Sequence, residues 1–239
     1  MPTTRPEGGC GDDMEHSEGD PQQAVRFFLR PLGNPLPLGF VGLAGGTLAL
    51  AGMQLGWVPT AQSHQVALAI LLIAVPLQFI SSVLGFLSRD PVAGTGMGTL
   101  AVAWLTTSVL TFLSPPGSRS AVLGLVLFYL AAAVLVSAVI AASGKALAGL
   151  VLAVATARFA VTGVYEYFGG TGWMYTAGWL GLALCVIALY AVLAFELEGI
   201  QAKTVLPTLR RGLGRRAMTS EGLTPIGPVE HEAGIRQQL

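Results

Sequence analysis

The sequence predicts an all-α integral membrane protein with six transmembrane helices. Hydrophobic residues make up 53% of the 239-residue chain and charged residues only 11%, against about 25% charged in an ordinary soluble domain. Six apolar stretches are each long enough to cross a hydrocarbon core about 30 Å thick, which takes roughly 20 helical residues. Separated by Pro, Gly, Ser or charged residues, they lie at 38–58, 66–88, 94–113, 121–143, 146–165 and 176–197.

The sequence divides into three segments. Residues 1–33 are polar, acidic and rich in Gly and Pro, so we expect a disordered cytoplasmic leader. Because this leader lacks the short basic region of a secretory signal peptide, the first apolar stretch is expected to stay in the mature protein. A six-helix transporter or channel domain over residues 34–207 follows, and residues 208–239 are expected to form a basic, mostly disordered cytoplasmic tail.

The distribution of Lys and Arg predicts the orientation. Six spans place both termini on one side, and eleven of the 13 basic residues fall on that side. Arg119 alone lies on the opposite side, and Arg158 lies inside the fifth span. Because Lys and Arg in short flanking segments are retained in the cytoplasm, we expect both termini to be cytoplasmic. The expected location is the plasma (inner) membrane, as a multi-pass protein.

Small residues recur at four-residue spacing within the spans, as in Gly42 with Gly46 and Gly94 with Gly98. Such faces let helix backbones approach closely, so helix packing is the expected use. A second interpretation is a narrow pore lined by bare backbone, for which residues 95–98 are the first candidate. Ser, Thr and Gln side chains at membrane depth are expected mostly to bridge helices.

Few residues are suited to catalysis or to metal binding. The three histidines are far apart, since they lie in the leader (His16), the first outer loop (His64) and the tail (His231). The two cysteines are also far apart, with Cys10 in the leader and Cys185 in the sixth span. No buried His is available to activate a Ser or Thr hydroxyl as a nucleophile. We therefore expect transport rather than catalysis, with no catalytic residue, metal site, cofactor or nucleic-acid partner.

The most specific pattern starts the first span, where residues 34–39 read Asn-Pro-Leu-Pro-Leu-Gly. Proline disfavours the α conformation at the residue before it, so the helix is predicted to begin near Pro37, with Asn34 or a neighbour capping its first amides. A helix N-terminus also attracts a carboxylate, although a cap without a ligand explains the pattern equally well. The candidate substrate-binding residues are Asn34, Pro35, Pro37, Leu38 and Gly39.

Three motifs, in this order, resemble those of the acetate uptake transporters, a family that includes the bacterial acetate/succinate permease and related fungal carboxylate and ammonia-export proteins. The first is the Asn-Pro-x-Pro-Leu-Gly pattern of residues 34–39. The others are Ala-Gly-Trp-Leu-Gly at 177–181 with Ala-Leu-Tyr at 188–190, and Lys-Thr-Val-Leu-Pro at 203–207. Gln78 and Trp104 also fit the pattern of this family. The resemblance therefore covers nearly the whole membrane region.

The resemblance implies a protomer of a homo-hexamer in the lipid bilayer. It also implies passage of acetate and other short-chain mono- or dicarboxylates such as succinate, either proton-coupled or channel-like. A substrate site is expected near the Asn-Pro motif, and a pore constriction at Leu43, Leu100 and Ala155. The first two of these positions are often aromatic in the family and are Leu here, which puts the substrate preference in question.

Arg158 lies three residues after Ala155, and hence close to the same helix face. An Arg near the centre of a membrane helix costs about 2.5–3.5 kcal/mol on insertion scales and seldom lacks a partner. It could attract an anionic carboxylate toward the constriction. The alternative is that it reaches the outer interface or pairs with Glu166. With few titratable groups at depth, any proton is expected to travel on the substrate or on water.

Two other functions remain open from the sequence. A channel for a small neutral solute, such as ammonia, urea or undissociated acid, would have the same architecture. A non-transporting membrane scaffold would use the small-residue faces for assembly and the basic cluster at residues 210–216 for anionic lipid. Retention of positive charge in the cytoplasm explains that cluster by itself.

Overall fold

The structure, a computed structural model, describes residues 33–201 and 206–208. Within this part the chain forms six α-helices and one short 3-10 turn. They are α1 (Leu36–Gln54), η2 (Thr60–Gln62), α2 (Ser63–Leu87), α3 (Pro91–Leu113), α4 (Ala121–Gly144), α5 (Ala146–Phe168) and α6 (Thr171–Gln201). All six α-helices are long and apolar enough to cross a membrane. The predicted all-α fold with six spans is confirmed.

Several sequence-based expectations concern residues outside the described part. These are the leader up to residue 32, the tail from residue 209 with its basic cluster, and most of the motif at 203–207. Cys10, His16 and His231 also fall there. The expectations for these residues stay predictions.

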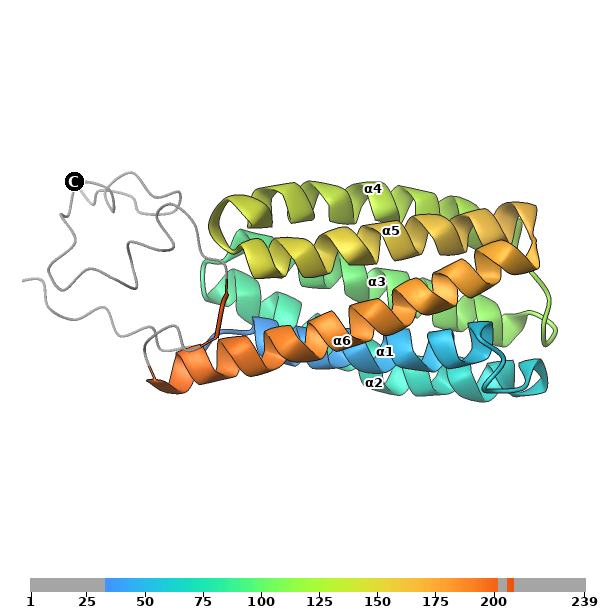
Figure 1. The fold of residues 1–239 in the computed structure, drawn as a ribbon, viewed down its shortest axis with the longest axis horizontal. Helices are drawn as coiled ribbons and strands as arrows, with labels where there is room; N and C mark the ends of the chain where they lie inside the picture. The colour runs from blue at the N-terminus through green and yellow to red at the C-terminus, as the bar shows by residue number, and fades with distance from the viewer. Residues whose placement is uncertain (1–32, 202–205, 209–239) are drawn as a thin grey trace, which may run out of the picture. The chain divides into compact units, whose positions relative to one another are not determined.

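The six helices form a closed ring. Each helix packs against its successor in the chain, and α6 packs against α1. Figure 1 shows the helices running side by side, with the start of α1 and the end of α6 at the same end of the bundle. Consequently α1, α3 and α5 run in one direction, and α2, α4 and α6 run in the other.

The two ends of α1 are set by a side-chain cap and by a glycine. The Leu36 amide donates to Asn34 Oδ1 at 3.1 Å, and α1 begins at Leu36, one residue before the predicted start. The helix ends at Gln54 rather than at the predicted residue 58. The cause is Gly56, whose φ of 78° is incompatible with a continuing right-handed helix.

At the other end of the chain α6 starts earlier than predicted. Gly169 and Gly170 both adopt positive φ, at 83° and 99°, and so make the turn out of α5. The helix can begin immediately afterwards at Thr171, five residues before the predicted start at residue 176.

The corners of the ring at the end where α1 begins are held together by Asp90 and Lys145. Asp90 caps α3 by accepting a hydrogen bond from the Ala93 amide at 3.1 Å. Its other carboxylate oxygen pairs with Nζ of Lys145, the residue that joins α4 to α5. The α2–α3 and α4–α5 hairpins are therefore linked at this end.

Glycines let neighbouring helices pack closely within the protomer. A Cβ added to Gly46 would lie 2.8 Å from Cβ of Ala74 in α2. One added to Gly85 in α2 would lie 2.6 Å from the backbone nitrogen of Gly94 in α3. The expected use of the small residues in helix packing is confirmed at these positions.

The glycines of residues 95–98 are also covered by side chains. A Cβ on Gly96 would lie 3.6 Å from Cδ1 of Leu152, and one on Gly98 would lie 2.8 Å from Oγ of Ser82. The interpretation of this stretch as a pore lined by bare backbone is therefore wrong, because α5 and α2 fill the space beside it.

Two serines of α2 bridge to the adjacent helices. Ser81 Oγ donates to the Pro35 carbonyl at 2.7 Å, and Ser82 Oγ donates to the Gly94 carbonyl at 2.7 Å. Both side chains are buried. The expectation that polar groups at membrane depth join helices is confirmed here, with α2 bonded to the start of both α1 and α3.

We predict that Gly85→Ala lowers the free energy of unfolding in detergent micelles by about 1–3 kcal/mol, because overpacked side chains force backbone shifts of that cost. The added methyl group would meet the backbone of α3, which cannot move aside as a side chain can. Gly172→Ala is the matched control, since no atom lies within 4 Å of a Cβ at that position. Equal thermal stability of the two variants would contradict the tight α2–α3 contact.

Candidate functional site

The Asn-Pro motif forms the first turn of α1. The Leu36 amide donates to Asn34, Pro37 has no amide hydrogen, and the Gly39 amide donates to the Pro35 carbonyl at 3.3 Å. The Leu36 amide is thus used by the cap, and the Gly39 amide by the first helical hydrogen bond. The substrate-binding role stays a prediction for Asn34, Pro35, Pro37, Leu38 and Gly39.

The second and third motifs contact each other near the end of α6. The Tyr190 hydroxyl donates to the Pro207 carbonyl at 3.3 Å. The next residue, Thr208, is fully buried and its carbonyl accepts from the Leu147 amide at 3.4 Å. The chain after α6 thus returns to the start of α5.

The predicted constriction residues Leu43, Leu100 and Ala155 have no exposed surface. They belong to one contiguous core and come from α1, α3 and α5, the three helices that run in the same direction. A narrowing of the pathway at this level stays a prediction.

Buried or half-buried residues continue from these three positions toward the far end of the ring. They recur at spacings of three to four residues, so each set follows one face of its helix. The sets are Leu43, Thr47, Leu50 and Gln54 on α1, Leu100, Trp104, Thr107 and Thr111 on α3, and Ala155, Arg158, Thr162 and Glu166 on α5. The three helices therefore present successive layers to the inside of the ring.

Arg158 lies in the layer directly beyond the predicted constriction, and its side chain is fully buried. Its Nη1 donates to the Ala177 carbonyl at 3.2 Å and its Nη2 to the Thr47 carbonyl at 3.3 Å. Its Cζ lies 5.9 Å from the centre of the Trp104 ring, within the range of a cation–π contact.

The alternative interpretation of Arg158, in which it reaches the outer interface or pairs with Glu166, is wrong. Full burial excludes a side chain that reaches the outer interface. No ion pair joins Arg158 to Glu166 or to another carboxylate of the described residues. The carboxylate of Glu166 instead accepts from the Ser120 amide at 2.9 Å. The guanidinium is therefore a buried cation held by two carbonyl groups and by the face of Trp104.

Several polar atoms around Arg158 have no hydrogen-bond partner within the described residues. Nε of Arg158 and Nε1 of Trp104 are two such donors, and both side chains are fully buried. One turn outward, Thr162 Oγ1 is also unpartnered. A buried polar group without a partner costs about 1–3 kcal/mol. This part of the ring can therefore supply hydrogen bonds to a small polar solute.

Two glycines create the space for this layer. A Cβ on Gly181 of α6 would overlap Nη1 of Arg158, and one on Gly46 of α1 would lie 3.2 Å from Cε2 of Trp104. Gly181 belongs to the motif at residues 177–181, whose first residue supplies a carbonyl to the guanidinium. The first and last residues of this motif thus both lie against Arg158.

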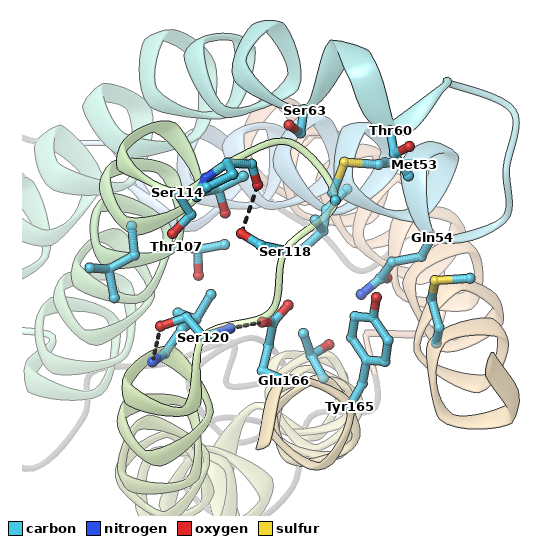
Figure 2. A pocket seen from close by; sticks show the side chains of 18 residues that line it. Met53, Gln54, Thr60, Ser63, Thr107, Ser114, Ser118, Ser120, Tyr165 and Glu166 are labelled. Atoms are coloured by element: carbon cyan, nitrogen blue, oxygen red, sulfur yellow. Dashed lines mark hydrogen bonds between the residues drawn. The ribbon is translucent and has the colours of Figure 1, made fainter. Parts of the chain in front are cut away.

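A cavity of about 70 Å³ lies at the end of the ring opposite the start of α1. Leu50, Thr107 and Thr162 lie deepest by their position along their helices, one turn beyond the Arg158 layer. Figure 2 shows Gln54 and Glu166 projecting toward it from two different helices, α1 and α5. Its wall also includes Tyr165 and the loop of residues 114–120.

The cavity has both apolar and polar lining residues, and one of its side chains is charged. Glu166 is the only Asp, Glu, Lys, Arg or His among the residues that line it. Arg158 precedes Thr162 by four residues, so its Cα lies about 6 Å further along the helix axis. A solute that enters from this end therefore passes Glu166, with Arg119 nearby, before it reaches the level of Arg158, one turn below the cavity floor.

Sequence reasoning did not identify this cavity. Gln54, Thr107 and Thr162 were expected among the polar groups at membrane depth, of which most bridge helices and a few could replace the hydration of a carboxylate. Trp104 was expected only to fit a family resemblance. The similar spacing on the first, third and fifth spans is the sequence signal that could have grouped them. Gly181 has no such signal, because its contact with Arg158 depends on how α6 packs against α5.

The described residues offer little for covalent or metal chemistry. Residues 33–201 and 206–208 contain no group of three His, Cys, Asp or Glu that could hold a metal ion. His64 lies outside the cavity, with Nε2 3.0 Å from the Ser114 carbonyl. Cys185 is a buried free thiol. The arrangement supplies charge and hydrogen bonds rather than a nucleophile with its base.

We predict that Gly181→Ala lowers the free energy of unfolding by about 1–3 kcal/mol, because the new methyl group displaces the Arg158 side chain. The loss should be smaller when Arg158→Gln is also present, since the shorter side chain leaves room. Thermal unfolding of the two single variants and the double variant in detergent measures this coupling. Strictly additive effects would contradict the contact.

The fold resembles that of a solved channel. The structure of the bacterial acetate channel SatP matches with a TM-score of 0.66, over 74% of this chain and 98% of that chain, at 23% sequence identity. No family model matches the chain, and no curated protein matches it by sequence. The resemblance first drawn from three short motifs is therefore supported at the level of the fold, and the six long apolar helices support a multi-pass membrane protein.

Proposed function

We propose that this protein lets acetate and other short-chain carboxylates cross the membrane along the inside of its helix ring. The solute enters the cavity at the outer end and exchanges its water for hydroxyl and amide groups. It then moves one turn deeper to the layer of Arg158 and Trp104 and passes the level of Leu43, Leu100 and Ala155. Mono- and dicarboxylates, including succinate, are the candidate solutes.

The observation that carries this proposal is the buried guanidinium of Arg158. It has no carboxylate partner among the described residues and lies one turn below a cavity lined in part by hydroxyl and amide groups. A charge buried in a membrane protein is costly and is most often tied to function. The free Nε of Arg158 and Nε1 of Trp104 are hydrogen-bond donors that suit an anionic oxygen. The fold shared with an acetate channel supports the same solute class.

Arg158 also distinguishes the proposed carboxylate pathway from a neutral-solute channel and from a membrane scaffold. A pathway for ammonia or urea gains nothing from a buried cation, whereas a carboxylate gains its counter-charge there. A scaffold would need neither the cavity nor the unpartnered donors around Arg158. An anion pathway, proton-coupled or channel-like, accounts for the charge and the space together.

We further propose that the chain forms a homo-hexamer in the plasma membrane with both termini cytoplasmic. Among the described residues, Arg89 and Lys145 lie at the end where α1 begins, whereas Arg119 lies in the loop at the cavity end. This asymmetry, together with the basic residues outside the described part, supports the cytoplasmic placement of the termini. The hexamer rests on the family resemblance, and the native mass of the purified protein in a lipid nanodisc tests it.

We predict that Arg158→Gln lowers the uptake of radiolabelled acetate into proteoliposomes at least about tenfold, since a lost charge-assisted hydrogen bond costs about 1.5–3 kcal/mol. Arg158→Lys should retain part of the activity because it keeps the charge. Arg89→Gln, the same change at an exposed residue remote from the cavity, is the matched control. Uptake by Arg158→Gln equal to that of the native protein at every pH would contradict the role of the charge.

A further inference from the structure

We infer that Glu166 is a positioning residue, whose carboxylate holds the loop of residues 114–120 at the mouth of the cavity and does not itself bind the solute. The loop, held in this way, presents its hydroxyl groups to a solute that enters. This inference rests on the proposed function and gives a role to the one charged side chain that lines the cavity. It follows from the contacts that the loop makes at its start, its tip and its end.

The loop forms a large part of the cavity wall. Figure 2 shows it running along the cavity between α3 and α4. Five of its seven residues line the cavity, namely Ser114, Pro115, Gly117, Ser118 and Ser120. The loop contains no helix, so its shape depends on what it contacts.

The start and the tip of the loop contact the connection between α1 and α2 and the first turn of α2. Nε2 of His64, in α2, lies 3.0 Å from the Ser114 carbonyl. At the tip, a Cβ on Gly117 would lie 3.6 Å from Cβ of Thr60 in η2, which is a van der Waals contact. Thr60 also lines the cavity. Two connections between helices therefore border the mouth and touch each other there.

The end of the loop is held by α5 through Glu166. The carboxylate accepts from the Ser120 amide at 2.9 Å. Ser120 in turn caps α4, since its Oγ accepts from the Leu123 amide at 3.2 Å. Arg119 lies near this carboxylate and packs against the turn after α5, where a Cβ on Gly169 would overlap its guanidinium. A hydrogen bond and an opposite charge from the loop thus both act on Glu166.

Glu166 is poorly suited to bind an anionic solute directly. An ionised carboxylate only accepts hydrogen bonds, so it cannot form one with the carboxylate of a solute, and the two like charges repel each other. The Ser120 hydroxyl can do what Glu166 cannot. It accepts from the Leu123 amide and can donate its own hydrogen to a solute. By fixing Ser120, Glu166 places this donor at the cavity.

The first test separates the hydrogen bond of Glu166 from its charge. Acetate uptake into proteoliposomes is measured over a range of concentrations near neutral pH. We expect Glu166→Ala to raise the half-saturating concentration at least about threefold, as for the loss of one ordinary hydrogen bond, while the maximal rate is largely kept. Glu166→Gln should retain most of the native value, because its amide oxygen can still accept from the Ser120 amide.

Glu196→Ala is the matched control, since Glu196 is an exposed residue of α6 that does not line the cavity. Equal effects of Glu166→Ala and Glu166→Gln would overturn the inference, because the charge rather than the hydrogen bond to the loop would then decide. Native uptake by both variants would overturn it as well.

The second test replaces the hold of Glu166 by a disulfide. Thr60→Cys with Gly117→Cys places two Cβ atoms 3.6 Å apart, within the usual range for a disulfide. Cys10→Ser is added, so that the buried Cys185 is the only other thiol. In Glu166→Ala this disulfide should restore the half-saturating concentration, and its reduction should raise the concentration again.

Gly117→Ala controls for the strain of a side chain at a φ of 77°. A disulfide that forms in Glu166→Ala without restoring the half-saturating concentration would overturn the inference.

The third test needs no transport. A nitroxide label on Ser118→Cys, at an exposed position of the loop, reports the motion of the loop by electron paramagnetic resonance. The label should be more mobile in Glu166→Ala than in the native background, and no more mobile in Glu166→Gln. Equal mobility in all three would overturn the inference. Absence of acetate uptake by the native protein would instead contradict the proposed function, so the two failures are distinct.

Discussion

The burial of the Arg158 guanidinium inside a ring of apolar helices is the interaction on which the rest of the site depends. Removing a charge from water costs several kcal/mol. Two carbonyls and the face of Trp104 offset this cost, at about 1.5–3 kcal/mol for a hydrogen bond to a charged group and about 2 kcal/mol for a desolvated cation–π contact. The carbonyls belong to Ala177 of α6 and Thr47 of α1. The same bonds therefore hold α5 against α1 and α6, where the ring closes.

The surrounding sequence is adapted to this side chain. Gly181 leaves the volume that the guanidinium fills, and Gly46 does the same for Trp104. Phe159, the next residue of α5, packs edge-on against Trp104 with ring centres 5.8 Å apart. Thr47 fixes the closure further, since its hydroxyl donates to the Gly181 carbonyl at 3.4 Å. A change at any of these positions also shifts the Arg158 guanidinium, because close-packed interiors transmit strain.

The fold was largely predictable from the sequence, and the errors have local causes. The spans followed from the length of apolar helix that a bilayer needs. Their ends were wrong at Gln54 and Thr171, where glycines with positive φ decide the turn. The pore of bare backbone proposed at residues 95–98 was wrong because Leu152 and Ser82 cover the glycines there. Spacing identifies a small-residue face but does not identify what lies on it.

The sequence by itself determined that the chain has six apolar helices, that Asn34 and the prolines start the first one, and that one Arg lies at membrane depth. Helix length, capping and hydropathy are local properties, and so they can be read along the chain. Only the tertiary structure decided that Arg158 turns inward to carbonyls of α1 and α6, up to 111 residues away in the chain. Helical spacing tells which residues share a face, whereas the packing of helices remote in sequence decides what each face meets.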